Sequence, residues 1–184
     1  MAAKNDRLYW DASVFLCFLA EEEEERRQIC EDILPHAKDG KVEIITSMFT
    51  LVEVIRPKAI KYPKPLTDGQ VVLLDGMFKW PWVKKIQVHE DLAREAGKLA
   101  RAHGLKPADA IHAATAIAEK ADQLQRWDYD FQKIAHLIPV TEPAYLSQMP
   151  LLQVRPLIGP TPTAFASSSE PEPLGVQSPD DEQD

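Results

Sequence analysis

Short apolar runs that alternate with helical segments limit the folds open to this chain more than any other feature. Leu8–Trp10, Val42–Thr46, Val83–Val88 and Leu124–Trp127 are predicted strands, and Leu137–Ile138 is a predicted edge segment. Helical periodicity fills the stretches between these runs. Because two parallel strands need a crossover between them, usually a helix, this order predicts a parallel sheet. We therefore expect an α/β fold, a three-layer α/β/α sandwich with a central parallel sheet.

Local signals set the ends of the helices. Thr67 is a potential N-cap, Gly104 stops a helix, and Pro107 opens the next helix at a position that proline favours. A further helix ends before Pro57, because the residue preceding a proline avoids helical geometry. The expected helices span Ala12–Leu19, Glu21–Ala37, Phe49–Ile55, Thr67–Phe78, His89–Ala102, Pro107–Ala121 and Phe131–Ala135.

Composition divides the chain into two parts. Hydrophobic residues make up 45% of the 184 residues, which is enough for one domain with a core, assigned to residues 1–146. Residues 147–184 are rich in proline and hold six acidic residues against one basic residue, Arg155. Such a segment buries little apolar surface, so we expect a disordered, acidic, proline-rich tail.

The negative total charge does not exclude a nucleic-acid substrate. The chain carries a net charge of −8, of which the tail contributes −5, so residues 1–146 carry only −3. Binding to nucleic acid depends on local basic patches, although scattered lysines also serve solubility. The residues that could form a patch are Lys58, Lys61, Lys64, Lys84, Lys85, Lys98, Arg101 and Lys106.

Several other classes of protein are disfavoured. The two cysteines, Cys17 and Cys30, form no CxxC motif and no cluster with histidine, so neither a zinc site nor a disulfide framework is expected. No apolar run approaches 18 residues, and the N-terminus lacks a signal-peptide pattern. We expect a cytoplasmic protein that does not interact with a membrane.

Acidic residues lie at the edges of apolar segments or inside them. These residues are Asp11, Glu53, Asp109 and Asp128, with Asp130 beside the last. A buried carboxylate is costly unless something neutralises its charge. Two unit charges 4 Å apart repel by about 4 kcal/mol at an effective dielectric constant of 20. Their spread along the chain therefore predicts that folding gathers them round a divalent cation.

Each acid also has a purely structural interpretation. Asp11 and Asp128 can cap the helices that follow them, and Asp130 can cap the last helix. Glu53 can lie on a polar helix stripe, and Asp109 lies in a first turn, where the helix dipole favours an acid. His112 shares a face with Asp109 and is either a packed histidine or a hydrogen-bond partner in the site.

Carboxylates without histidine or thiol ligands favour Mg²⁺ or Mn²⁺ over zinc. In this hypothesis Asp11, Glu53 and Asp109 hold the metal, while Asp128 completes the shell or orients the attacking water. The hydroxyl of Ser13 holds Asp11 or a phosphate, or else caps the following helix. The chemistry that fits is metal-dependent hydrolysis of phosphodiester bonds, with RNA as the expected substrate.

Four blocks of the sequence, in order along residues 6–141, resemble PIN-domain nucleases. They are Tyr9-Trp-Asp-Ala-Ser-Val-Phe-Leu, Thr46-Ser-Met-Phe-Thr-Leu-Val-Glu-Val, Gly104-Leu-Lys-Pro-Ala-Asp-Ala-Ile-His-Ala-Ala-Thr-Ala and Leu124-Gln-Arg-Trp-Asp-Tyr-Asp-Phe. The resemblance implies a PIN-like α/β/α fold and a Mg²⁺- or Mn²⁺-dependent ribonuclease that forms a homodimer. Many bacterial members are VapC-type toxins, inhibited by an antitoxin protein. Carried over to this chain, the catalytic and metal-binding acids are Asp11, Glu53, Asp109 and Asp128, with Asp130 and Ser13 as auxiliary residues.

The chain departs from the family pattern in the last block, and its acidic, proline-rich tail lies outside that pattern. Arg126 stands where the family usually carries a serine or threonine, two residues before Asp128. Two alternatives stay open. One is a non-catalytic PIN-like module that binds nucleic acid or protein, in which Arg126 neutralises the acids. The other is a DNA-directed single-strand or flap nuclease that uses the same acids.

Overall fold

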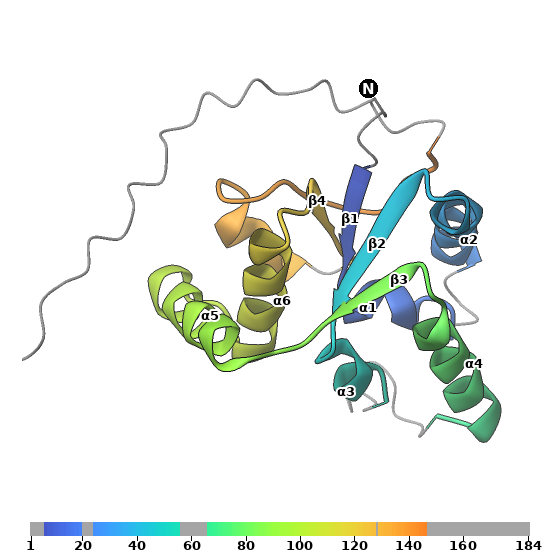
Figure 1. Cartoon of the computed structure of the whole chain (residues 1–184), viewed down its shortest axis with the longest axis horizontal. Helices are drawn as coiled ribbons and strands as arrows, with labels where there is room; N and C mark the ends of the chain where they lie inside the picture. The colour runs from blue at the N-terminus through green and yellow to red at the C-terminus, as the bar shows by residue number, and fades with distance from the viewer. Residues whose placement is uncertain (1–5, 20–23, 56–65, 128, 147–184) are drawn as a thin grey trace, which may run out of the picture. The chain divides into compact units, whose positions relative to one another are not determined.

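The four predicted strands all form, and a fifth strand extends the sheet at one edge. The computed structural model describes residues 6–19, 24–55, 66–127 and 129–146. The strands are β1 (Asp6–Trp10), β2 (Val42–Ser47), β3 (Val83–Ile86), β4 (Gln123–Gln125) and β5 (Val140–Thr141). They pair in the order β3-β2-β1-β4-β5, and every pair is parallel. The expected parallel sheet is therefore confirmed (Figure 1).

The helices follow the predicted order, and those with start signals at Thr67 and Pro107 begin there, whereas the last helix begins two residues before the predicted Phe131. They are α1 (Ala12–Leu16), α2 (Glu24–Lys38), α3 (Thr50–Ile55), α4 (Asp68–Lys79), α5 (Glu90–His103), α6 (Pro107–Ala118) and a 3-10 helix, η1 (Tyr129–Ile134). Thr67 caps α4 in a capping box with Gln70. Gly104 ends α5 with φ of 63°, a left-handed conformation that glycine adopts without steric cost.

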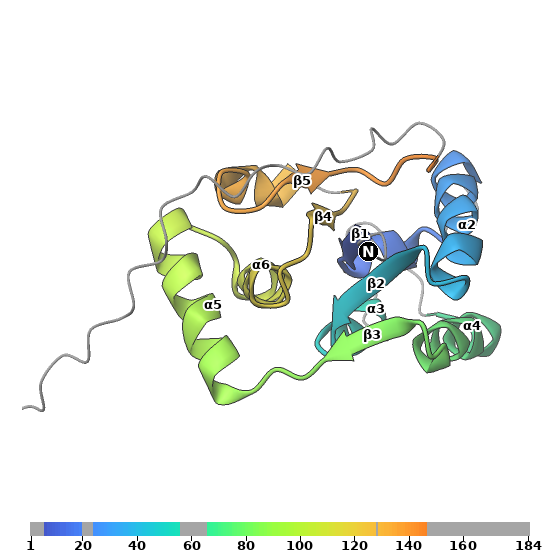
Figure 2. The same cartoon turned by 45° about the horizontal axis from the view of Figure 1, so that its top comes forward.

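Helices cover both faces of the sheet, which gives the predicted three layers (Figure 2). Side chains alternate along β1: Leu8 and Trp10 belong to a core formed with α1, α2, α3 and α4. Tyr9 points into a second core, formed with α5, α6 and η1. Because both faces are covered, the strands read as nearly continuous apolar runs rather than as alternating ones.

The strand order fixes where a site can form. The chain runs outward from the central strand β1 to β2 and β3, then returns to place β4 on the other side of β1. The direction in which successive strands are added to the sheet therefore reverses between β1 and β4. In open parallel sheets, ligands bind beyond the carboxyl ends of the strands at such a switch point. Asp11 follows β1, and Arg126 and Trp127 follow β4, at this end of the sheet.

The prediction of an edge segment at Leu137–Ile138 is wrong, because the edge strand β5 forms at Val140–Thr141. Ile138 is buried in the second core, and the N–H of Leu137 donates to Ile134 in the turn that closes η1. Proline lacks an N–H but keeps its carbonyl, so pairing with β4 starts where Leu124 N donates to the Pro139 oxygen at 2.8 Å.

Some predictions concern residues outside the described ranges. These are the tail at 147–184 and the potential patch residues Lys58, Lys61 and Lys64, and the boundary at residue 146 stays a prediction. Among the residues that the structure describes, no helix has the length and apolar character needed to cross a membrane.

The two cysteines give a direct test of the packing of α1 against α2. Cys17 and Cys30 are both buried and reduced, with their Sγ atoms 3.5 Å apart. The neighbouring Cys17 thiol, together with burial, raises the pKa of the Cys30 thiol far above its usual range. Because only the thiolate is nucleophilic, we expect neither cysteine of the folded protein to react with iodoacetamide at pH 8. Both should react in 6 M guanidinium chloride, as counted by mass spectrometry. Rapid labelling of the native protein would contradict this packing.

Candidate active site

Asp11 is a nearly buried carboxylate at the carboxyl end of the central strand. It is 6% exposed and caps α1. Its Oδ1 accepts hydrogen bonds from the N–H groups of Ser13 at 2.9 Å and Val14 at 3.3 Å, and from the Ser13 hydroxyl at 2.6 Å. Its own N–H donates to the Gln125 carbonyl at 3.2 Å, which fixes the end of β1 against β4. The capping interpretation of Asp11 is therefore correct, and it leaves the residue at the switch point.

Ser13 connects Asp11 to the segment that follows β4. Its hydroxyl donates to Asp11 Oδ1 and accepts from the backbone N–H of Trp127 at 2.8 Å. The helix cap is Asp11 rather than Ser13, so the alternative that Ser13 caps the helix is wrong. One side chain therefore holds the loop before Asp128 in register with the carboxylate at the end of β1. Asp128 itself lies outside the described residues.

Glu53 reaches the site from α3 and is held by a histidine of α6. Its carboxylate pairs with Nε2 of His112, whose Nδ1 lies 2.8 Å from the Tyr9 hydroxyl. Burial raises the pKa of Tyr9 well above its usual value of 10, and the charge of Asp11 adds to the effect. The tyrosine therefore keeps its proton, and its hydroxyl is hydrogen-bonded to Nδ1. Because a carboxylate only accepts hydrogen bonds, Nε2 is the donor in the pair with Glu53.

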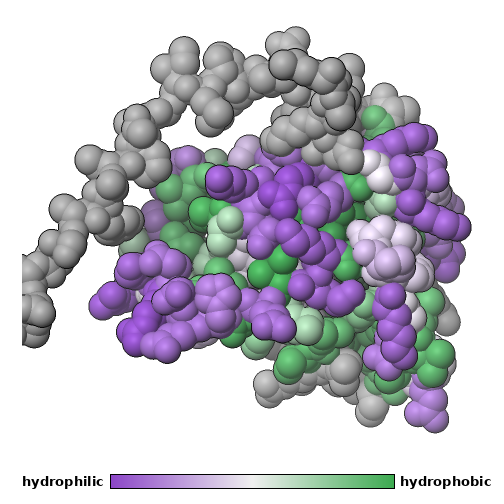
Figure 3. Space-filling model, in the orientation of Figure 1, coloured by the Kyte–Doolittle hydropathy of each residue, from purple (hydrophilic) through white to green (hydrophobic). Residues whose placement is uncertain are grey.

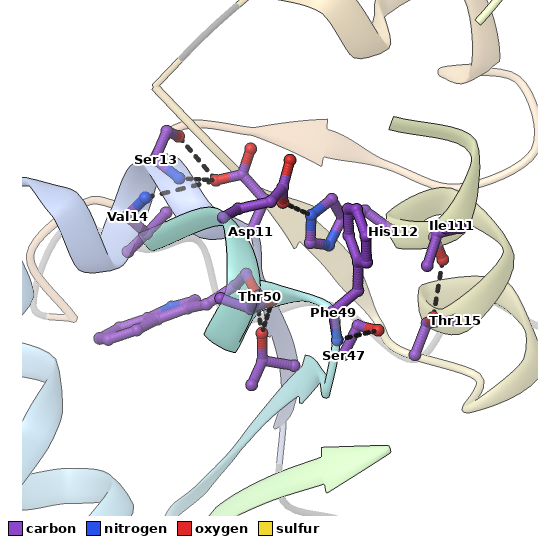
Figure 4. A network of polar contacts seen from close by, with 12 residues as sticks. Asp11, Ser13, Val14, Ser47, Phe49, Thr50, Ile111, His112 and Thr115 are labelled. Atoms are coloured by element: carbon purple, nitrogen blue, oxygen red, sulfur yellow. Dashed lines mark hydrogen bonds and ion pairs between the residues drawn. The ribbon is translucent and has the colours of Figure 1, made fainter. Parts of the chain in front are cut away.

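Two hydroxyls place α3 above the end of β1. Thr46, in β2, donates to the Trp10 carbonyl at 2.8 Å. Because its proton is used there, the Thr50 hydroxyl donates to Thr46, also at 2.8 Å. The Ser47 hydroxyl accepts the N–H of Phe49 at 3.1 Å and so starts the turn into α3. Figure 4 shows Ser47, Phe49 and Thr50 beside Asp11 and His112.

Asp109 is the half-buried third residue of α6. Burial raises its pKa above the usual value of 3.8, and the carboxylates of Asp130 and Glu53 raise it further. The positive charge of Lys106 and the ring of His112 partly oppose this shift. Because the charges of Glu53 and Asp130 reach Asp109, the three acids share one electrostatic environment.

Asp130 lies at the outer edge of this group. It is exposed, and its Oδ2 forms an ion pair with Lys106 Nζ at 2.8 Å. Lys106 is the N-cap residue of α6, so the pair docks the start of η1 against the start of α6. This contact is made in place of the helix cap that the sequence suggested for Asp130.

The carboxylate set has the chemistry that Mg²⁺ or Mn²⁺ requires. Asp11, Glu53 and Asp109 offer oxygen ligands, and the charges of Asp11 and Glu53 both act on the hydroxyl of Tyr9. Within the described ranges, no group of three His, Cys, Asp or Glu side chains is arranged as a preformed metal cage. Magnesium is usually bound by one or two carboxylates together with waters and substrate phosphates. The donor set therefore fits a hydrated Mg²⁺ better than an ion such as zinc that is enclosed by protein ligands.

Arg126 does not neutralise the described acids. It is 2% exposed, and its Nε and Nη1 have no hydrogen-bond partner among the residues that the structure describes. The guanidinium instead lies over the ring of Tyr129, with Cζ 5.0 Å from the ring centroid. The contact proposed for a non-catalytic module is thus not made to Asp11, Glu53 or Asp109.

Sequence reasoning missed Tyr9 and underestimated His112. Tyr9 is read from the sequence as a core residue of a strand, and it is indeed fully buried. Its hydroxyl was the available signal, because a buried tyrosine needs a hydrogen-bond partner. His112 was read mainly as a packed residue, yet both of its ring nitrogens are bonded within the site.

Comparisons with known proteins agree with the fold. A family model described as the PIN domain matches residues 8–137. VapC20 of Mycobacterium tuberculosis, a toxin that cleaves the sarcin-ricin loop, is 16% identical, with a TM-score of 0.54 over 67% of this chain and 92% of that chain. A toxin–antitoxin complex from Klebsiella pneumoniae is 19% identical, with a TM-score of 0.52 over 76% of this chain and 99% of that chain.

A third similar structure is VapBC2 of Rickettsia felis, bound to a DNA fragment from its promoter. It is 20% identical, with a TM-score of 0.51 over 74% of this chain and 97% of that chain. At such identities the likeness concerns the fold. No curated protein sequence matches the chain.

The raised pKa of Asp109 predicts a pH-dependent cost to stability. A carboxyl group whose pKa is higher in the folded state favours folding below its usual value of 3.8, and this contribution is lost as the pH rises through the folded-state pKa. In EDTA at pH 7, Asp109→Asn should therefore raise the midpoint of thermal unfolding. The difference from the wild type should shrink as the pH falls toward 4. Asp75→Asn, at an exposed position of α4, is the control. An equal difference at both pH values would contradict the assignment.

Proposed function

The chain belongs to the PIN domain family, whose members are nucleases, and from that membership we propose that it is a metal-dependent endoribonuclease. The reaction would be hydrolysis of RNA phosphodiester bonds. The observation that supports the proposal is electrostatic: the charge of Glu53 raises the pKa of Asp109, and the charges of Asp11 and Glu53 both act on the hydroxyl of Tyr9, although the three acids come from separate helix starts. Such a cluster is costly without a cation, and its oxygen ligands suit Mg²⁺ or Mn²⁺.

We assign the metal to Asp11, Glu53 and Asp109, with Asp128 completing the set and Asp130 at its edge. When bound, the cation would supply charge neutralisation at the phosphate and a more acidic water. His112 holds Glu53 in place through its Nε2 proton, and Tyr9 fixes the orientation of the imidazole. Ser13 holds the Asp11 carboxylate and the loop after β4 at the same time. These contacts keep the acids in place before substrate arrives, which is what catalysis by positioned charge requires.

RNA is the proposed substrate, and single-stranded DNA is the alternative that the assay must test. The similar VapC20 is described as a toxin that cleaves the sarcin-ricin loop, which supports RNA. Among the expected basic residues, Lys84 pairs with Glu119, and Lys106 pairs with Asp130. Lys106 is therefore the basic group nearest to the acids by contact, and we assign it to a substrate phosphate beside Asp109.

A protein partner is also proposed, either an antitoxin or a second copy of this chain. Apolar side chains are exposed over α3 and α4, where Val52 is 61%, Val72 70% and Leu73 46% exposed. These helices lie in the lower part of the view in Figure 3, where hydrophobic surface is visible. Contiguous apolar surface of this kind is typical of an interaction site. Toxin–antitoxin complexes are among the similar structures, which supports the role of a toxin in such a pair.

Asp11→Asn should reduce RNA cleavage at least about 100-fold and leave the fold intact. Asparagine keeps the oxygen that caps α1, since it is as good an N-cap as aspartate, but it lacks the negative charge. Cleavage of a labelled single-stranded RNA, with a DNA oligomer of the same sequence in parallel, is the measurement. Asp75→Asn controls for loss of an acid elsewhere. Cleavage by Asp11→Asn at the wild-type rate would refute the assigned role, and cleavage of DNA alone would identify a DNA-directed nuclease.

Metal binding should appear as stabilisation by linkage. A ligand that binds only the folded state raises stability by RT ln(1 + [L]/Kd), which is about 2.7 kcal/mol at a concentration 100 times Kd. We expect Mn²⁺ and Mg²⁺ to raise the unfolding midpoint of the wild type above its value in EDTA, but not that of Asp11→Asn. Differential scanning fluorimetry measures both proteins side by side. If both midpoints shift equally, the ion binds elsewhere.

A further inference from the structure

Tyr129 is the most exposed large hydrophobic residue among those described, at 77%. It is the first residue of η1 and stands between Asp128 and Asp130, just beyond the carboxyl end of β4. The other exposed residues of η1 are polar, namely Asp130, Gln132 and Lys133. Within η1, the ring is therefore the one exposed aromatic group, and its exposed neighbours along the helix are polar.

The ring is backed by a buried charge. The guanidinium of Arg126 lies 5.0 Å from the centroid of the Tyr129 ring, in the range of a cation–π contact. Arg126 is 2% exposed, and its Nε and Nη1 have no partner among the described residues. Among the residues that the structure describes, no carboxylate forms an ion pair with this permanently charged group, and a buried charge without such a partner is destabilising. Within the described part of the chain, the contact with the exposed ring of Tyr129 is what engages the guanidinium.

Contacts made by the neighbouring residues place this ring at the rim of the acid cluster. Asp130, the next residue, pairs with Lys106 at the start of α6. The charge of Asp130 in turn contributes to the raised pKa of Asp109. On the other side, Trp127 is tied through Ser13 to Asp11. The segment that carries Tyr129 is thus fixed at both ends to groups of the candidate site.

We propose that Tyr129, backed by the guanidinium of Arg126, is the platform on which a base of the substrate strand stacks. This assignment rests on the proposed function and adds the class of substrate, a single-stranded nucleic acid with an unpaired base next to the phosphate at the acids. Stacking on an aromatic ring tolerates any base, because every base has a π-face. The cation behind the ring holds its plane and leaves the outer face to the base.

The charges around the ring favour a base over an apolar protein anchor. A protein hot spot needs neighbouring apolar surface to exclude water. Such surface is found over α3 and α4, whereas η1 offers a carboxylate, an amide and an ammonium group around one ring. A nucleotide can use both features, with its base on the ring and its phosphate near Lys106.

The test measures binding of the full-length protein to a fluorescent single-stranded RNA 12-mer by anisotropy, in Ca²⁺ to slow cleavage. Tyr129→Leu removes the π-face at similar size and should weaken binding about 5- to 150-fold, the range for loss of one stacked base. Tyr129→Phe should bind within about twofold of the wild type, since the ring alone is needed. Leu137→Ala, at a position 45% exposed beyond η1, is the matched control and should bind as the wild type.

Arg126→Met separates support of the ring from a structural role. It keeps the length of the side chain and removes its charge, so the thermal midpoint should stay equal or rise. RNA binding should nevertheless weaken about 2- to 5-fold through loss of the cation–π contact. A lower midpoint with unchanged binding would assign Arg126 to the fold alone and overturn its part in the proposal.

The outcomes for this inference and for the proposed function are distinct. If Tyr129→Leu binds RNA as tightly as the wild type does, the platform is refuted, even where cleavage is observed. The exposed ring would then be assigned to contact with a protein partner. If the wild type binds RNA through Tyr129 but cleaves none in Mn²⁺, the platform stands and the nuclease proposal fails. If the wild type does not bind RNA at all, the platform is refuted.

Discussion

The carboxylate of Asp11 is the group on which the arrangement of the site depends. It is nearly buried at the end of the central strand, where an ionised acid is tolerated only if its oxygens are hydrogen-bonded. Two N–H groups at the start of α1 and the Ser13 hydroxyl satisfy Oδ1. The same hydroxyl accepts a hydrogen bond from the N–H of Trp127. The side chain that helps to satisfy Asp11 at the start of α1 therefore also fixes the loop after β4. Capping and function are therefore not competing interpretations of Asp11, because the cap is what makes its position reproducible.

The second half of the site is organised by a relay across the sheet. Tyr9 belongs to β1, His112 to α6 and Glu53 to α3, and their side chains form one hydrogen-bonded chain. Tyr9 lies in the core with α5, α6 and η1, while α3 contributes Val54 to the opposite core. The relay therefore links the two layers at the end of the sheet.

The candidate site is locally unfavourable for folding. Asp109 has a raised pKa because burial and neighbouring acids oppose its ionisation, and Arg126 is buried without a hydrogen-bond partner for two of its nitrogens in the described part of the chain. The two apolar cores and the five paired strands stabilise the fold and offset the unfavourable free energy of these groups. Violations of local rules that gather at one end of a sheet are expected at functional sites.

The sequence by itself determined the order of strands and helices, the caps at Thr67 and Gly104, and the positions of the acids, since these depend on periodicity and on neighbours a few residues away. It also indicated the family through four short blocks. It placed the edge strand wrongly, because a two-residue strand is specified by its partner β4 rather than by its own pattern. Only the tertiary structure joined Tyr9, His112 and Glu53, tied Ser13 to Trp127, and placed Arg126 behind Tyr129. All but the last of these contacts join residues 59 to 114 positions apart, and chain packing, not local sequence, decides such contacts.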